Sequence, residues 1–345
     1  MKAAVLTGVR RVEIREVPKP GIRSADDVLL RTDIAGLCGS DLHYFIAEKV
    51  GGETVPYPAI AGHECTAIVE AVGPRVQQVK PGERVVIEPA ISCGECDQCR
   101  AGRFNTCRRI RFLGHPGEMD GCFCEFFVMP ERNCLPLPKE LSMAEGMLAE
   151  PLSIALHAWQ FADSAAVRAM AVLGTGPIGI CLVLAAKAAG VPEIFATDKS
   201  EARVAAAVKA GAVWAGNPDR RDIVKTIIER QPLGLDAVFE CSGDPAAIDQ
   251  AVELVTPGGR IFQVGIPIEE RVALSFRKLR RKEVAIQNIR RQNRCLEKAL
   301  GLVANRHLDV SWLATHAFKL EDAQKAFTTA AARLDGVLKA SIVFG

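Results

Sequence analysis

Residues 169–186 read AMAVLGTGPIGICLVLAA, a stretch of eighteen residues without a charged side chain. A run of this length is at the threshold for a membrane-spanning helix. Three glycines and a proline between residues 174 and 179 interrupt it, however, and these residue types mark turns. We therefore predict a buried strand over 169–173, a tight glycine-rich turn and a helix over 178–189.

Strands and helices continue to alternate after this stretch. We predict strands at 193–197, 236–240 and 260–264, the last closing the series, and helices at 201–210 and 245–254. Strands that alternate with helices of about ten residues are typical of parallel βαβ units. Residues 154–289 are therefore predicted to form a Rossmann-like, doubly wound parallel sheet.

The residues before this region have a different pattern. Up to about residue 153, short apolar alternations such as 28–32 are broken repeatedly by proline and glycine, which favours an antiparallel sheet or small barrel rather than helices. The tail from about residue 293 has helical periodicity and a final strand over 339–344, and it could return to the first domain. The predicted fold is thus α/β with two domains, 1–153 plus 290–345 and 154–289.

The turn after the first buried strand has the spacing Gly-x-Gly-x-x-Gly. In a strand–turn–helix context, its glycines allow a tight turn, close approach of a pyrophosphate and close contact between helix and strand. Asp198 ends the next strand, where a carboxylate would accept a hydrogen bond from a ribose 2′-hydroxyl and repel a 2′-phosphate. NAD is therefore favoured over NADP, although Arg203 could accommodate that phosphate or lie on the adenine. The predicted cofactor-binding residues are Gly174, Gly176, Pro177, Ile178, Gly179, Asp198 and Arg203.

Cysteine is frequent, with 12 in 345 residues, and four lie close together as Cys93-x2-Cys96-x2-Cys99-x7-Cys107. Zinc is bound tetrahedrally by four thiolates at such short spacings. Because the shell would be closed, with no position for water, this zinc is predicted to be structural. The alternatives are two disulfides, unrelated buried thiols, or a nucleic-acid-binding zinc knuckle.

Charge and the N-terminal residues bear on compartment and partners. The 43 basic and 41 acidic side chains give a formal net charge of +2, which offers little attraction for a polyanion. Residues 1–15 include several charged side chains and lack the apolar run of a secretory signal. A soluble, cytoplasmic protein without nucleic-acid or membrane partners is therefore predicted.

A second group of potential metal ligands is scattered along the chain. Cys38 lies in the segment GLCGSDLH, His63 and Glu64 in AGHE, and Glu150 in LAEPLS. Taken singly, such residues are more often packed in a core than bound to metal. Their order, together with PGERV at 81–85, the four-cysteine segment and the glycine-rich turn, resembles the zinc-dependent medium-chain dehydrogenases. The resemblance covers essentially the whole chain and is greatest to the sorbitol (polyol) dehydrogenase branch.

This resemblance implies a GroES-like catalytic domain, a Rossmann domain, a catalytic zinc in the cleft between them, and a homodimer or homotetramer. It implies that Cys38 and His63 are zinc ligands with Glu64 as the third, and that Glu150 ligates the zinc or touches it through water. Ser40 and His43 match the proton-relay positions, and Tyr44 and Arg290 are predicted substrate contacts. Ala67 stands where the family usually has glycine.

The reaction implied is hydride transfer from a polyol or other secondary alcohol to NAD, with one catalytic and one structural Zn²⁺ per chain. Nine basic residues between 271 and 294 are interpreted as a solvated or subunit-contact surface; alternatively, they grip the phosphate of a polyol phosphate. A relative that has lost catalysis is a further alternative, which the retained ligand and relay residues disfavour. The seven other cysteines are predicted to be reduced thiols.

Overall fold

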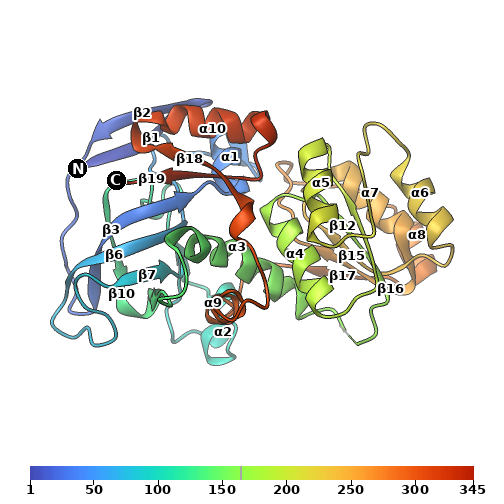
Figure 1. Ribbon diagram of the computed structural model, residues 1–345, viewed down its shortest axis with the longest axis horizontal. Helices are drawn as coiled ribbons and strands as arrows, with labels where there is room; N and C mark the ends of the chain where they lie inside the picture. The colour runs from blue at the N-terminus through green and yellow to red at the C-terminus, as the bar shows by residue number, and fades with distance from the viewer. Residues whose placement is uncertain (164) are drawn as a thin grey trace. The chain divides into compact units, whose positions relative to one another are not determined.

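The computed structural model describes residues 1–163 and 165–345. The chain divides into two compact units, one formed by Met1–Glu150 with Leu296–Gly345 and the other by Pro151–Cys295 (Figure 1). The predicted domain boundaries, after residues 153 and 289, lie a few residues from these. The first boundary falls inside helix α3 (Met143–Trp159). The sequence did not predict this helix, because Pro151 lies in its interior, where proline normally ends a helix.

The first unit is built on a mostly antiparallel sheet. Among the described residues its strands are ordered β11-β7-β6-β3-β19-β18, and β10 also pairs with β3. The strands are β3 (Asp27–Gly36), β6 (Glu64–Val72), β7 (Arg84–Ile87), β10 (Phe126–Pro130), β11 (Cys134–Pro136), β18 (Ala314–Lys319) and β19 (Lys339–Val343). Ser341 of β19 pairs with Gly36 of β3, so the C-terminal tail completes the sheet of the first unit.

Shorter elements surround this sheet. They are the hairpin β1 (Lys2–Gly8) and β2 (Arg11–Glu16), the two-residue strands β4 (Lys49–Val50), β5 (Glu53–Thr54), β8 (Ala90–Ile91) and β9 (Arg111–Phe112), and the helices α1 (Gly39–Ile46), α2 (Asp97–Arg100), α9 (Leu296–Ala304) and α10 (Ala323–Ala332). The buried rings of Phe45, Phe123 and Phe327 meet in the core, with centroids 5.3 and 5.5 Å apart. The expectation of strands rather than helices was wrong for α1, because its two turns are too short for apolar periodicity to be recognised.

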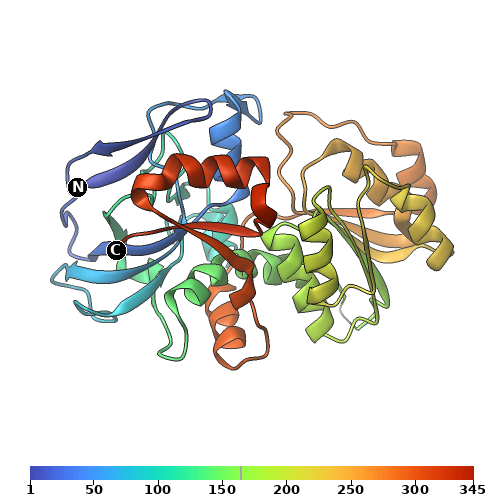
Figure 2. The ribbon, with the colours of Figure 1, turned by 45° about the horizontal axis from the view of Figure 1, so that its top comes forward.

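The second unit contains the predicted doubly wound parallel sheet, with helices beside its strands (Figure 2). Over the described residues the strand order is β14-β13-β12-β15-β16-β17. The strands are β12 (Ala169–Leu173), β13 (Glu193–Thr197), β14 (Trp214–Gly216), β15 (Leu235–Glu240), β16 (Val255–Gln263) and β17 (Ala285–Asn288). The helices are α4 (Pro177–Ala188), α5 (Glu201–Ala210), α6 (Ile223–Arg230), α7 (Pro245–Leu254) and α8 (Phe276–Lys282). The strand order reverses between β12 and β15, and such a switch point is where doubly wound sheets bind ligands.

The strand predicted at 260–264 does not close the sheet, because β17 pairs with β16 beyond it. β17 reads AIQN and all four residues are exposed, so no apolar run indicates it. The helix before it, α8, is largely basic, and its sequence resembles a solvated surface more than a sheet-covering helix. Among the described helices, none is long and apolar enough to cross a membrane.

Candidate metal and dinucleotide sites

The four clustered cysteines of the first unit converge on one point. Their sulfur atoms all lie within 4.8 Å of one another. The Sγ atom of Cys96 lies 3.6 Å from that of Cys99 and 3.9 Å from that of Cys107, and Cys93 Sγ lies 3.9 Å from Cys99 Sγ. Zinc–sulfur bonds of about 2.3 Å in a tetrahedron place the sulfurs about 3.8 Å apart. The cluster therefore has the dimensions of a four-thiolate zinc site.

Backbone N–H groups stabilise negative charge on these sulfurs. Cys107 Sγ accepts hydrogen bonds from Cys93 N at 3.2 Å and Arg109 N at 3.4 Å. Backbone donors, that of Glu95 first, lower the pKa of Cys93 to about 6, whereas burial raises the pKa of Cys99 to about 11. Because zinc binds thiolates, a loop that already favours thiolates at part of the set suits this metal.

We expect Cys99→Ser to release one zinc per chain and to lower the midpoint of thermal unfolding by about 5–10 °C, because a structural zinc contributes to folding free energy. Metal analysis and calorimetry measure both effects. Cys124→Ser is the matched control. The buried Cys124 thiol donates to the carbonyl oxygens of Gly121 and Phe126 at 3.3 and 3.1 Å, and a serine hydroxyl can donate to the same acceptors. A Cys99→Ser protein that keeps its full zinc content would contradict this assignment.

The second predicted ligand set is brought together by two paired strands. Gly36, at the end of β3, pairs with Glu64, at the start of β6. Cys38 follows the first strand and His63 precedes the second, so both lie at the same end of this strand pair. One ligand atom from each of Cys38, His63 and Glu64 lies within 4.8 Å of the others. The structure thus joins three predicted ligands that are distant in sequence.

Asp41 lies beside this set and orients it. It is fully buried, and its carboxylate accepts hydrogen bonds from Cys38 N at 2.9 Å and Gly62 N at 3.2 Å. Its Oδ1 also lies 3.7 Å from His63 Nδ1. A carboxylate on the Nδ1 side of a histidine leaves Nε2 for a metal. Asp41 stands in the GLCGSDLH segment, but its sequence position alone did not indicate this role.

Glu64 is paired with a buried lysine that the sequence analysis missed. Lys339 of β19 is 1% exposed, and its Nζ contacts Glu64 Oε2. A Cβ at Gly36 would lie 2.8 Å from both Glu64 Oε2 and Lys339 Cε, so only glycine leaves room for the pair. Burial alone would lower the pKa of Lys339, but the charges of Glu64 and Cys38 outweigh it and raise that pKa.

Glu150 of α3 is also buried, but its carboxylate is not part of the 4.8 Å set. Burial and then the charge of Glu64 raise its pKa well above the ordinary value. Burial, followed by the charge of Glu64, also raises the pKa of Cys38 to about 12. A divalent cation would offset this concentration of buried acidic groups, so the donor set of one thiol, one imidazole and carboxylates fits zinc.

The predicted relay and substrate residues lie on two different units. Ser40, His43 and Tyr44 belong to α1, where Ser40 and His43 are three residues apart and so share a face. Burial lowers the pKa of His43. The rings of Tyr44 and His115 pack edge to face, with their centroids 6.1 Å apart. Arg290 is exposed and follows β17 in the second unit.

Ala67, which stands where the family usually has glycine, lies in the extended strand β6, a conformation that any residue adopts.

The glycine-rich turn has the geometry that its spacing predicts. Gly174 follows β12 with φ of +93°, and Gly176 is the N-cap of α4, with Pro177 at its first turn. A Cβ at Gly179 would collide with the Gly174 carbonyl oxygen, whereas at Gly176 the nearest atom, 3.6 Å away, belongs to Arg203. The first and third glycines therefore serve the turn itself, and the second leaves room for a ligand above the helix N-terminus.

Asp198 follows β13 and is 7% exposed. Its carboxylate accepts hydrogen bonds from Thr175 N and Ser200 N, both at 2.9 Å, and lies 3.9 Å from Arg203 Nη1. It therefore connects the glycine-rich turn with the start of α5 (Glu201–Ala210). A carboxylate has about four acceptor positions, so two bonded N–H groups leave capacity for ribose hydroxyls.

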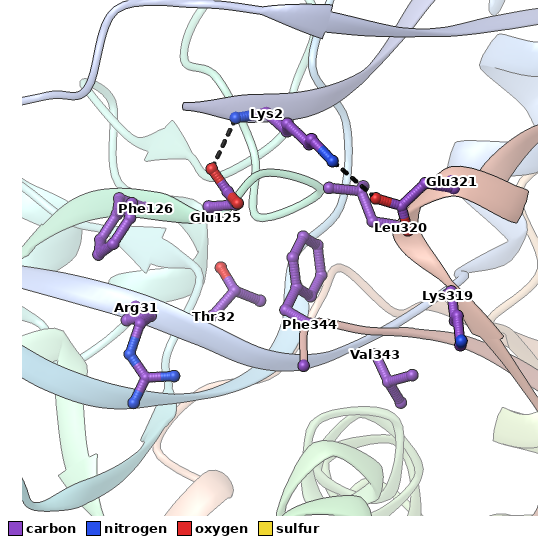
Figure 3. Close-up of a pocket in the computed structure, with 11 residues that line it drawn as sticks. Lys2, Arg31, Thr32, Glu125, Phe126, Lys319, Leu320, Glu321, Val343 and Phe344 are labelled. Carbon is purple, nitrogen blue, oxygen red and sulfur yellow. Dashed lines mark hydrogen bonds and ion pairs between the residues drawn. The ribbon is translucent and has the colours of Figure 1, made fainter.

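A separate surface cavity of about 440 Å³ lies on the first unit, and none of the predicted site residues lines it (Figure 3). Lys2 on its wall is bonded to Glu125 through its backbone N–H at 2.7 Å and to Glu321 through Nζ at 2.9 Å. The charge of the Lys2 ammonium group is thus paired with that of Glu321. Because its lining residues are not those of the metal or dinucleotide sites, the cavity is distinct from both.

Comparisons with known proteins agree with this arrangement. The family described as Alcohol dehydrogenase GroES-like domain matches residues 24–139, and the family described as Zinc-binding dehydrogenase matches residues 177–305. The chain therefore belongs to the zinc-dependent medium-chain dehydrogenases. Within them it falls in the polyol dehydrogenase branch, and its α/β fold combines a GroES-like and a Rossmann domain.

Individual relatives match along nearly the whole chain. A sorbitol dehydrogenase of Bacillus subtilis is 36% identical over 96% of this chain and 93% of its own. An L-idonate 5-dehydrogenase of Vitis vinifera is 33% identical over 95% of this chain and 91% of its own. A zinc-binding dehydrogenase of Sinorhizobium meliloti, solved with NADP bound, is 28% identical with a TM-score of 0.89, and the match covers 99% of both chains.

Proposed function

We propose that this protein oxidises a polyol, or another secondary alcohol, to the ketose or ketone with NAD as the hydride acceptor. The observation that carries the proposal is the convergence on one point of Cys38, which is half-buried, with His63 and Glu64, which are buried. Three protein ligands leave the fourth position of a zinc ion open, which is the pattern of catalytic rather than structural zinc. Zinc held there would lower the pKa of an alcohol oxygen enough to allow ionisation near neutral pH.

The chain's own residues would handle the proton released from the alcohol. Ser40 is the proposed first acceptor, because it lies in the first turn of α1, two residues after the proposed ligand Cys38 at the N-cap. His43 shares its face of α1, and burial lowers its pKa, so the imidazole is neutral and can accept a proton near pH 7. Glu150 is proposed to touch the metal from outside the three-ligand set, and Tyr44 and Arg290 to contact substrate hydroxyls.

The second unit is proposed to hold the dinucleotide. The pyrophosphate would lie over Gly176, at the N-terminus of α4, where backbone N–H groups and the helix dipole favour negative charge. Pro177, Ile178 and Gly179 form the first helical turn beneath it. Asp198 would accept the ribose hydroxyls of the adenosine half, and this carboxylate supports NAD over NADP.

A panel of free polyols and polyol phosphates tests the proposal, with NAD and NADP in parallel and reduced nicotinamide followed by absorbance. We expect turnover of at least one free polyol with NAD. Turnover of polyol phosphates alone would favour a phosphate grip by the basic segment 271–294. Two basic residues of that segment already have partners in the second unit. Lys278 pairs with Glu253, and Lys282 donates to the carbonyl oxygens of Val252, Glu253 and Val255. Absence of turnover by protein containing two zinc ions would contradict the proposal.

Asp198→Ala is expected to change cofactor preference. Removing the carboxylate deletes a charge-assisted hydrogen bond to the NAD ribose and the repulsion of a 2′-phosphate. The ratio of kcat/KM for NAD to that for NADP should therefore fall about 100-fold, which corresponds to about 2.8 kcal/mol. Asp249→Ala, at an exposed position on α7, is the matched control. An unchanged ratio would show that Asp198 does not bind the ribose hydroxyls.

Assembly as a homodimer or homotetramer is proposed on the exposed strand β17, which forms one edge of the parallel sheet. Exposed sheet edges favour pairing with another chain unless they are covered. The exposed side chains of Ile286, Ile266 and Phe276 belong to β17 and the segment before it. Sedimentation analysis of the wild-type protein distinguishes monomer, dimer and tetramer.

A cytoplasmic location is proposed because all twelve cysteines, the proposed zinc ligands included, lie outside disulfides.

A further inference from the structure

Glu240 is a buried acid that the proposed reaction does not use. It ends β15 and is 0% exposed. Its carboxylate accepts hydrogen bonds from Ser242 N at 2.7 Å, from Ser242 Oγ, and from Gly243 N at 3.0 and 3.1 Å. Gln263 Nε2, at the end of β16, donates to the other carboxylate oxygen at 2.7 Å. Burying a carboxylate is costly, and these donors offset that cost.

The residues that bond to Glu240 lie at the carboxyl ends of β15 and β16, next to the switch point of the sheet. A Cβ at Gly174 would lie 2.7 Å from Ser242 N, so the loop after β15 packs directly on the glycine-rich turn after β12. Cys241 N donates to the Leu173 carbonyl oxygen at 2.7 Å and reinforces this contact.

The loop after β16 is fixed by the same residue. The Glu240 carbonyl accepts hydrogen bonds from Val264 N and Gly265 N, both at 2.8 Å. A Cβ at Gly265 would collide with Gly243 N and would lie 2.6 Å from Glu240 Oε2. Glu240 thus contacts both loops. Its side chain bonds to Ser242 and Gly243 after β15 and to Gln263 at the end of β16, and its backbone carbonyl bonds to the loop after β16.

We propose that Glu240 is a positioning residue for the nicotinamide half of the dinucleotide, an inference that rests on the proposed function. A doubly wound sheet holds the two halves of a dinucleotide on either side of its switch point. Asp198, after β13, marks the side of the adenosine half. The loops after β15 and β16 lie on the other side of the switch point. Glu240 would hold the backbone conformation of these loops without itself contacting the cofactor.

Two titrations on the zinc-loaded protein test the proposal, with NADH and AMP as probes. Glu240→Gln keeps the volume of the side chain but turns an amide donor toward the N–H groups of Ser242 and Gly243. We expect its affinity for NADH to fall about tenfold while its affinity for AMP changes less than about twofold. Gln263→Met removes the hydrogen bond that Gln263 donates to Glu240, and it should likewise weaken NADH binding but not AMP binding. The double variant should lose less than the sum of the two.

Asp236→Asn is the matched control. Asp236 lies at the opposite end of β15 and accepts hydrogen bonds from Arg168 N and Ala169 N at 2.8 and 2.9 Å. It should leave the affinity for NADH unchanged. Equal losses for NADH and AMP in Glu240→Gln and Gln263→Met, no loss for either probe, or an equal loss for NADH in Asp236→Asn would overturn the positioning role. Failure of the wild-type protein to bind NADH would instead refute the proposed function.

Discussion

Replacing Cys38 by serine should abolish turnover while leaving the binding of NADH intact. The serine hydroxyl does not ionise at neutral pH, so the site loses its only thiolate ligand among Cys38, His63 and Glu64. Metal at such a site contributes several kcal/mol to transition-state stabilisation, so kcat should fall at least about a thousandfold. The dinucleotide turn belongs to the other unit and lies 136 residues or more along the chain from Cys38.

Three measurements separate this prediction from a general loss of folding. Zinc content should fall from about two ions per chain to about one, NADH titration should be unchanged, and the thermal midpoint should fall less than in Cys99→Ser. Cys134→Ser is the control, since it makes the same change at a buried thiol of the first unit that belongs to neither metal-ligand group. A Cys38→Ser protein that is poor in zinc and fully active would refute the mechanism.

Lys339→Met should destabilise the metal-free protein by about 3 kcal/mol or more, because it leaves the Glu64 carboxylate buried without its cation. Urea denaturation of chelator-treated protein measures the loss. Added zinc should reduce the difference from the wild type, because the metal replaces part of the missing positive charge. Affinity for zinc is a second readout, and we expect it to change because Glu64 loses the partner that orients one of its oxygens.

The double variant Lys339→Met/Glu64→Gln distinguishes charge from packing. If the buried charge of Glu64 causes the instability, the double variant should recover most of the loss in the metal-free state, since replacing both members of a buried pair is often nearly neutral. A double variant as unstable as Lys339→Met alone would mean that the lysine contributes mainly by filling space beside Gly36.

The strands and helices that the sequence predicted best are those with a strong local pattern. The limits of β13, α5 and α7 agree with the prediction, because each has an uninterrupted period of apolar residues between clear turn signals. α3 and β17 were missed for the opposite reason. Pro151 breaks the helical pattern of the first, and the second is an exposed strand without apolar residues on a buried face.

The sequence alone determined the two features whose chemistry is contained in one short segment, the four-cysteine cluster and the glycine-rich turn. Their spacing along the chain sets their geometry, since the residues involved are separated by a single loop or turn. The site around Cys38 is different. The register of β3 against β6 places Cys38 beside His63 and Glu64, and β19 carries Lys339 to the same point from the far end of the chain. A buried charge needs a partner wherever the sheet brings one, and only the tertiary structure shows that this partner is Lys339.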